Sequence, residues 1–96
     1  MHSQRDSLAV ALKKLGYSMN TRNEAELEEA KQELIKQKPL VLAYIVDEIR
    51  DKMLSGEGAV AVAWSGDAMD VILSGETFNY VVPKEGSNFW IDAMVI

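Results

Sequence analysis

Two uninterrupted apolar runs constrain the fold of this chain more than any other feature of its sequence. One run occupies residues 40–46 and the other residues 59–64, and neither contains a charged side chain. Runs of this length without polar alternation are typical of strands that are covered on both faces. The sequence therefore predicts at least two buried strands.

Helical patterns lie before and between these runs. Apolar residues recur at helical spacing, Gly16 follows the first such segment as a helix C-terminus prefers, and Asn23 and Asp47 stand where N-caps are expected. A further helix is expected to open at Ser65. Four helices are predicted in this way, over residues 6–15, 24–36, 47–54 and 65–73.

Two further strands are predicted over residues 78–82 and 89–96, so helices alternate with strands along the chain. Such alternation favours an α/β fold with a mixed, mostly parallel sheet and helices on both faces. Residues 1–96, of which 48% are hydrophobic, are expected to form a single domain. Because the pattern opens on a helix and closes inside an apolar strand, we expect the domain to be excised from a longer protein.

Charge and composition exclude several functions. The formal net charge of −5 disfavours nucleic acid as a partner and favours a cationic ligand. The chain has no cysteine, and its one histidine, His2, stands at the extreme N-terminus, so no catalytic triad, thiolate metal site or cofactor motif is expected. No apolar export signal precedes the first helix. Catalytic residues, a metal and a cofactor are therefore not expected.

The candidate binding residues follow the predicted strands, because ligands of α/β sheets sit at the carboxyl ends of strands. Trp64 and Asp47 each stand at a strand-to-helix junction, and the period of two places Trp90 and Asp92 on one side of the last strand. An indole ring and a carboxylate side by side form a receptor for an ammonium group. The alternative is that both tryptophans are core residues and Asp92 is an ordinary strand-end carboxylate.

Three segments resemble the spermidine/putrescine-binding proteins of ABC importers. They are residues 5–18, residues 64–68, which read Trp-Ser-Gly-Asp-Ala, and residues 82–92, which contain Pro-Lys-Glu-Gly followed by Trp-Ile-Asp. The resemblance covers nearly the whole chain. It implies one lobe of a type II periplasmic-binding-protein fold, in which two lobes close on a polyamine.

The resemblance also implies the site residues. Trp64, Trp90 and Asp92 match aromatic and acidic positions that hold the polyamine in the family, and Asp6 matches an acidic position in its first-helix motif. Asp47 lies near a further polar contact position. Ser3 stands where the family often has another acid, which puts a contact there in doubt.

The resemblance implies partners and location as well. They are a polyamine, the other lobe of the parent protein and the membrane subunits of an importer, with the parent extracytoplasmic, either periplasmic or lipid-anchored at the cell surface. An isolated lobe with unpaired strand edges is also expected to form a homodimer or a strand-exchanged assembly. The open alternatives are a lobe for another small cationic or polar solute, a small acidic enzyme using Asp67 and Asp92, and an interaction domain without a small ligand.

Overall fold

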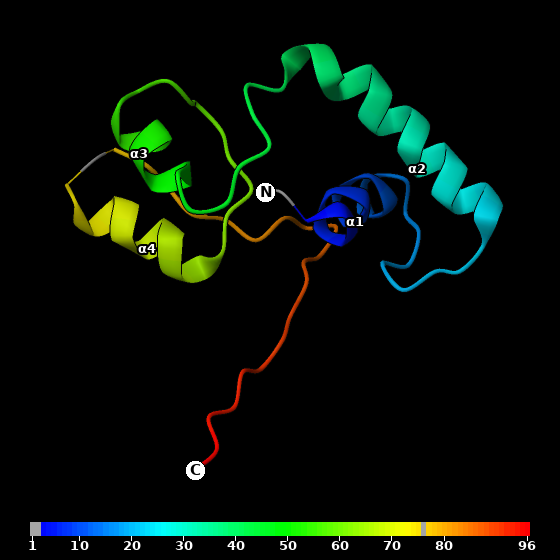
Figure 1. The fold of residues 1–96 in the computed structure, drawn as a ribbon. Coiled ribbons are helices and arrows are strands. Elements are labelled where there is room, and N and C mark those ends of the chain that lie inside the picture. Colours follow the sequence, from blue (N-terminus) through cyan, green and yellow to red (C-terminus); the bar gives the residue numbers. More distant parts are fainter. Residues whose placement is uncertain (1–2, 76) are drawn as a thin grey trace.

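The computed structural model describes residues 3–75 and 77–96 and contains two helical pairs joined by extended chain (Figure 1). The helices are α1 (Gln4–Lys14), α2 (Glu24–Gln37), the 3-10 turn η1 (Lys38–Leu40), α3 (Ile49–Leu54) and α4 (Ser65–Leu73). Helix α1 packs against α2, and α3 packs against α4. His2 lies outside the described residues.

The packing of α1 on α2 makes the main core. Leu12 and Ala11 of α1 and Ala30 of α2 are buried, and Leu12 is only 2% exposed. The small side chains of Ala11 and Ala30 leave room for Leu12 between the helices. Partly buried side chains surround this centre, namely Leu8, Leu15, Tyr17, Leu27 and Leu34.

Ion pairs and hydrogen bonds reinforce this helix pair from outside. The Lys14 ammonium lies 2.6 Å from Glu33 of α2, and the Tyr17 hydroxyl donates to Glu29 at 2.6 Å. Both contacts join the end of α1 and its following turn to α2. The helix pair is therefore stabilised by polar contacts at its surface as well as by its apolar core.

The observed helix ends agree with most of the predicted helix boundaries and caps. The Asn23 side chain accepts a hydrogen bond from the Ala25 backbone at 3.0 Å, as an N-cap does, and Gly16 has the left-handed φ of 82°. Helix α4 begins at Ser65 as predicted. Asp47, by contrast, does not cap α3, whose N-cap is Glu48 without a side-chain hydrogen bond.

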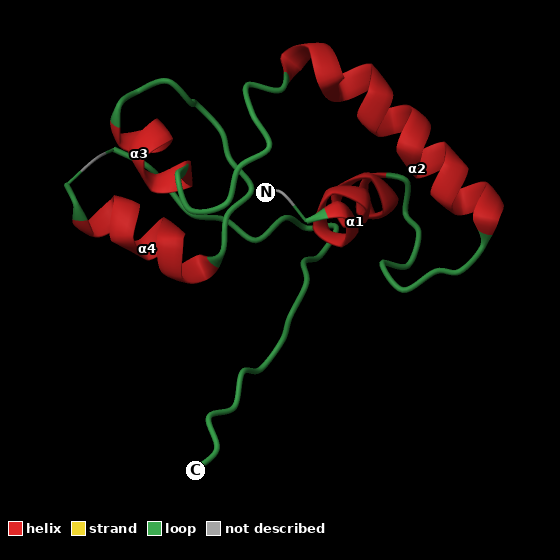
Figure 2. Cartoon of the chain, viewed as in Figure 1, coloured by secondary structure: helices red, strands yellow, loops and turns green. Residues whose placement is uncertain are grey.

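The predicted α/β fold, a mixed and mostly parallel sheet with helices on both faces as in one lobe of a type II periplasmic-binding protein, is wrong for this structure. Within the described residues there are helices and loops but no strand (Figure 2). No backbone hydrogen bond among those residues joins any two of the segments predicted as strands, residues 40–46, 59–64, 78–82 and 89–96.

The physical reason for this error lies in what an apolar run specifies. It indicates side chains that gain free energy by leaving water, but it carries no information on whether another segment lies beside it to cover them and supply ladder hydrogen bonds. The C-terminal residues 79–96 are all exposed, and Figure 1 shows the last of them leaving the helices as an extended tail. Val60 is 91% exposed, so the second run is not buried from both sides either.

The molecule is correspondingly expanded. Its radius of gyration is 14.8 Å, whereas a compact domain of this length has about 12.5 Å. No helix within the described residues is long and apolar enough to cross a membrane.

Candidate functional site

A groove with a volume of about 500 Å³ lies where three segments meet. The first turn of α1, the first turn of α4 and the extended residues 88–92 each contribute to its wall. Its lining comprises Asp6, Trp64, Ser65, Gly66, Asp67, Asn88, Trp90 and Asp92. The groove is rich in carboxylates and indole rings.

Asp6 reaches the groove from the first turn of α1. Ser3 is the N-cap of this helix, and its hydroxyl accepts a hydrogen bond from the Asp6 backbone N–H at 3.3 Å. A carboxylate in this turn is stabilised by the positive end of the helix macrodipole. Ser3 therefore caps the helix. It is also the residue at which the resemblance left a ligand contact in doubt.

Trp64 stands immediately before α4. Its backbone is extended, with φ of −70° and ψ of 153°, and it occupies the N-cap position without a side-chain cap bond. The chain therefore turns sharply from extended segment to helix at this residue. The Trp64 side chain is 38% exposed, so part of its ring surface is open to the groove and solvent.

Trp90 and Asp92 form a hydrogen-bonded pair on residues 88–92. The Trp90 indole N–H donates to an Asp92 carboxylate oxygen at 3.3 Å. Trp90 is 48% exposed, whereas its neighbours Phe89 and Ile91 are 84% and 82% exposed. Alternation along this segment thus turns Trp90 and Asp92 toward the groove even though the segment is not part of a sheet.

The turn before this segment brings it to α1. Gly86 donates its backbone N–H to the Pro83 carbonyl at 3.0 Å and has φ of 97°, which only glycine adopts without strain. A Cβ at Gly86 would lie 3.3 Å from Cε of Lys13. The turn therefore packs on α1 and carries Trp90 and Asp92 toward Asp6.

The structure brings four of the five predicted site residues together. Asp6, Trp64, Trp90 and Asp92 line the groove, and Asp47 is not among its lining residues. That these side chains contact a ligand remains a prediction.

Four groove residues were not among the predicted ligand-binding residues, namely Ser65, Gly66, Asp67 and Asn88. Asn88 lies two positions before Trp90, so the same period of two that paired Trp90 with Asp92 should have included it. Asp67 was considered as an acid of an alternative enzyme and was not predicted to contact the ligand. Its place in the first turn after Trp64 was the signal that it shares the groove.

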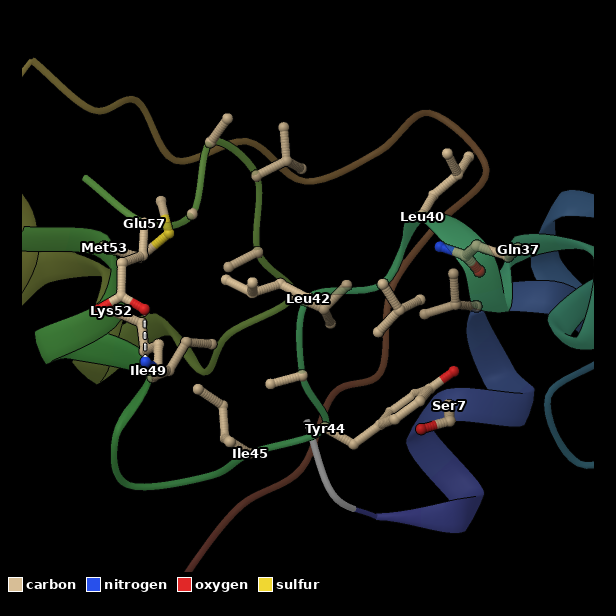
Figure 3. A pocket seen from close by; sticks show the side chains of 18 of the residues that line it. Ser7, Gln37, Leu40, Leu42, Tyr44, Ile45, Ile49, Lys52, Met53 and Glu57 are labelled. Carbon is tan, nitrogen blue, oxygen red and sulfur yellow. Dashed lines mark hydrogen bonds and ion pairs between the residues drawn. The ribbon is translucent and has the colours of Figure 1, made fainter. Parts of the chain in front are cut away.

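A second cavity, of about 480 Å³, differs from the groove in chemistry. It lies between the two apolar runs, and Figure 3 shows Leu42 and Tyr44 beside it together with Ile49 and Met53 of α3. The Lys52–Glu57 ion pair closes one side at 2.6 Å. With this mostly aliphatic lining, the cavity offers little to a charged ligand.

The groove suits a cationic ligand. Three carboxylates and two indoles line it, and both kinds of group attract ammonium. The described residues nevertheless contain no group of three His, Cys, Asp or Glu side chains that could hold a metal ion.

Curated relatives resemble the chain over nearly its whole length. The spermidine/putrescine-binding periplasmic proteins of Salmonella typhimurium and of Escherichia coli K12 are each 38% identical to it over 92 residues, which is 96% of this chain. The spermidine/putrescine-binding periplasmic protein 1 of Haemophilus influenzae is 34% identical over the same length.

The match covers nearly all of this chain but only a small part of each relative. The matched region is 26% of each of these relatives, so the chain spans about a quarter of their length. No protein-family model and no solved structure matches the chain. The predicted resemblance is confirmed: the chain is homologous, over almost all of its residues, to one part of the spermidine/putrescine-binding periplasmic proteins.

Proposed function

We propose that this chain supplies one half of a polyamine-binding cleft in the solute-binding component of an ABC importer. The observation that carries the proposal is the meeting of Trp64, Trp90, Asp6 and Asp92 in one groove of a homologue of spermidine/putrescine-binding proteins. In this role the indoles cover the alkyl and ammonium groups, and the carboxylates accept hydrogen bonds from the ammonium ends.

The same proposal assigns partners and location. The parent protein is extracytoplasmic, and its other lobe closes the cleft from the opposite side before the importer's membrane subunits receive the ligand. Support comes from the relatives' names, which describe periplasmic binding proteins, not enzymes, and from the open form of the groove, which leaves one face of a ligand in water.

The experiment is a titration of the 96-residue chain with spermidine, followed through the indole N–H signals of Trp64 and Trp90 in NMR spectra. We expect saturable but millimolar binding at best. Exposed cation–π contacts contribute only about 0.5–1 kcal/mol and exposed ion pairs about 0–1 kcal/mol, which together barely offset the entropy of capturing a flexible polyamine. Asp92→Asn should weaken binding about fivefold.

The matched control for this titration is Phe89→Ala. It removes an 84% exposed ring of the same segment that does not line the groove, so it should leave the dissociation constant unchanged. Absence of any indole shift with spermidine would reject the proposal, and a low-micromolar constant would mean that the site is complete without a second lobe. In the two-lobed parent, where the cleft closes, the same Asp92→Asn change should cost about 2 kcal/mol or more.

Self-association of the separate chain belongs to the same proposal. Its exposed apolar side chains, among them Val60, Val95 and Ile96, favour a homodimer or strand-exchanged assembly at high concentration. Light scattering across a concentration series tests this, and a monomer throughout the series would exclude it.

A further inference from the structure

We propose that residues 93–96 of one copy of this chain bind in the aliphatic cavity of a second copy, the cavity of about 480 Å³ between the two apolar runs. The proposal rests on the self-association proposed above and adds which segment is exchanged and where it is received. The partner is a second copy of the chain, not a small ligand.

The exchanged segment has the composition of a buried strand but lies in water. It reads Ala-Met-Val-Ile, without a charged side chain, and Val95 is 92% exposed while Met94 and Ile96 are fully exposed. No backbone hydrogen bond among the described residues engages it. Figure 1 shows it extending away from both helical pairs. Its side chains and its backbone N–H and C=O groups are therefore open to another molecule.

The receiving cavity has apolar walls and backbone N–H groups without backbone partners. Residues 40–45 and 58–62 form two of its walls, and Ile49 and Met53 of α3 supply further apolar side chains. The N–H groups of residues 42–46 and 59–64 donate to no backbone carbonyl within the described part of the chain. An uncharged extended segment can fill such a cavity and supply the missing ladder hydrogen bonds, as in β-strand addition.

The exchanged segment is not positioned to fill the cavity of its own copy. Asn88, Trp90 and Asp92, which precede it, line the acidic groove. The segment itself contains no Gly, Pro, Asn, Asp or Ser, the residues that favour tight turns. It continues outward instead of reversing, so a second copy is the molecule that it meets (Figure 1). Two copies can exchange the segment reciprocally about a two-fold axis.

The exposed area is large enough for such an exchange. The chain has an accessible surface of 7784 Å², whereas a compact monomer of this length exposes about 5,500 Å². The excess is roughly 2,300 Å² per copy, and a standard protein–protein interface buries about 800 Å² per partner. A reciprocal exchange therefore has more surface to cover than a stable dimer needs.

The first test introduces a charge into the exchanged segment. Met94→Glu places a carboxylate that the dimer would have to bury in the cavity, and it should weaken the dimer at least about tenfold in light scattering across a concentration series. Val81→Glu is the matched control, because Val81 is 74% exposed but lines neither the cavity nor the groove. It should change the dissociation constant of the dimer by less than about twofold. Circular dichroism of both variants verifies that the helices are retained.

The second test locates the segment in the dimer. The chain has no cysteine, so Ala93→Cys gives a single attachment point for a nitroxide beside Met94. Spin-labelled copies without isotopes are mixed with isotope-labelled unmodified copies, and amide signals are recorded by NMR. We expect paramagnetic broadening of the signals of residues 42–45 and 59–62 in the isotope-labelled copies, because only a segment from the other copy can bring the nitroxide there.

Three results would overturn the exchange, and they are distinguishable. A dimer that Met94→Glu weakens no more than Val81→Glu does, or that shows no broadening at the cavity, leaves self-association standing but removes this segment from it. Broadening that appears only when nitroxide and isotopes are on the same copy means that the segment fills its own cavity. A monomer at every concentration rejects the self-association and the exchange together.

Discussion

The α1–α2 pair and the extended segments differ in how their backbone N–H and C=O groups form hydrogen bonds. In the helices each internal N–H donates to the carbonyl four residues earlier, and the burial of Leu12 and Ala30 forms a core. The extended segments have no backbone hydrogen bonds to one another among the described residues, and their apolar side chains are largely in water. Helical structure needs only local partners, whereas extended structure depends on a neighbour from elsewhere.

The candidate site spans both kinds of structure. Asp6 belongs to α1, which is held by the core, while Trp90 and Asp92 belong to the exposed C-terminal segment and are positioned through the turn at Gly86. One wall of the groove is therefore firmly placed, and another depends on a single turn packed on Lys13.

The largest contrast should come from equivalent leucine truncations in the two regions. Leu12→Ala removes a side chain that is 2% exposed and should lower the free energy of unfolding by about 2–5 kcal/mol. Leu42→Ala removes a leucine of the extended segment that is 63% exposed and should change it by only about 0.5 kcal/mol. Urea unfolding monitored by circular dichroism measures both, and equal losses would contradict the division into a packed and an exposed region.

The same division explains which features could be predicted from sequence. Helices were predicted to within a few residues because capping residues and helical periodicity act locally, as Asn23 and Gly16 illustrate. The prediction of a sheet failed, since the apolar runs carry no information on which segment lies beside them. Trp90 and Asp92 share a side because a period of two applies to any extended chain, whether or not it is paired.

Asp47 shows that neighbouring sequence alone cannot identify every site residue. Its place after an apolar run predicted both a helix cap and a ligand contact, but α3 begins two residues later and Asp47 lies outside the groove. Asp67 and Asn88 reach the groove through the arrangement of three distant segments. That arrangement is tertiary, so neighbouring sequence alone could not assign it.

A smaller effect should follow from removing the cap of α2. Asn23→Ala deletes the acceptor of the Ala25 N–H and should cost about 1 kcal/mol of stability. Asn20→Ala, in the same loop, removes a side chain with no hydrogen bond among the described residues and should cost less than about 0.5 kcal/mol. Thermal unfolding of the two variants compares them, and a loss no larger than that of Asn20→Ala would mean that packing alone positions α2.

The smallest effect concerns Glu33, the carboxylate that joins the two packed helices. Hydrogen bonds from Lys14 of α1 and from Lys36 hold the pKa of Glu33 at about 2, below the ordinary 4.5. A lowered folded-state pKa stabilises the fold above pH 4.5, and that contribution disappears as the pH falls from 4.5 toward 2.

Glu33→Gln should therefore lower the unfolding temperature slightly at neutral pH and match the unmodified chain near pH 2. Glu28→Gln is the control, because Glu28 pairs with Lys31 within α2 and does not join the two helices. It should shift the midpoint less at neutral pH. High salt should shrink the Glu33 difference, since the Lys14 side chain is 70% exposed and its charge is readily screened. A difference between Glu33→Gln and the unmodified chain that does not change with pH would mean that packing of the Glu33 side chain, not its charge, joins α1 to α2.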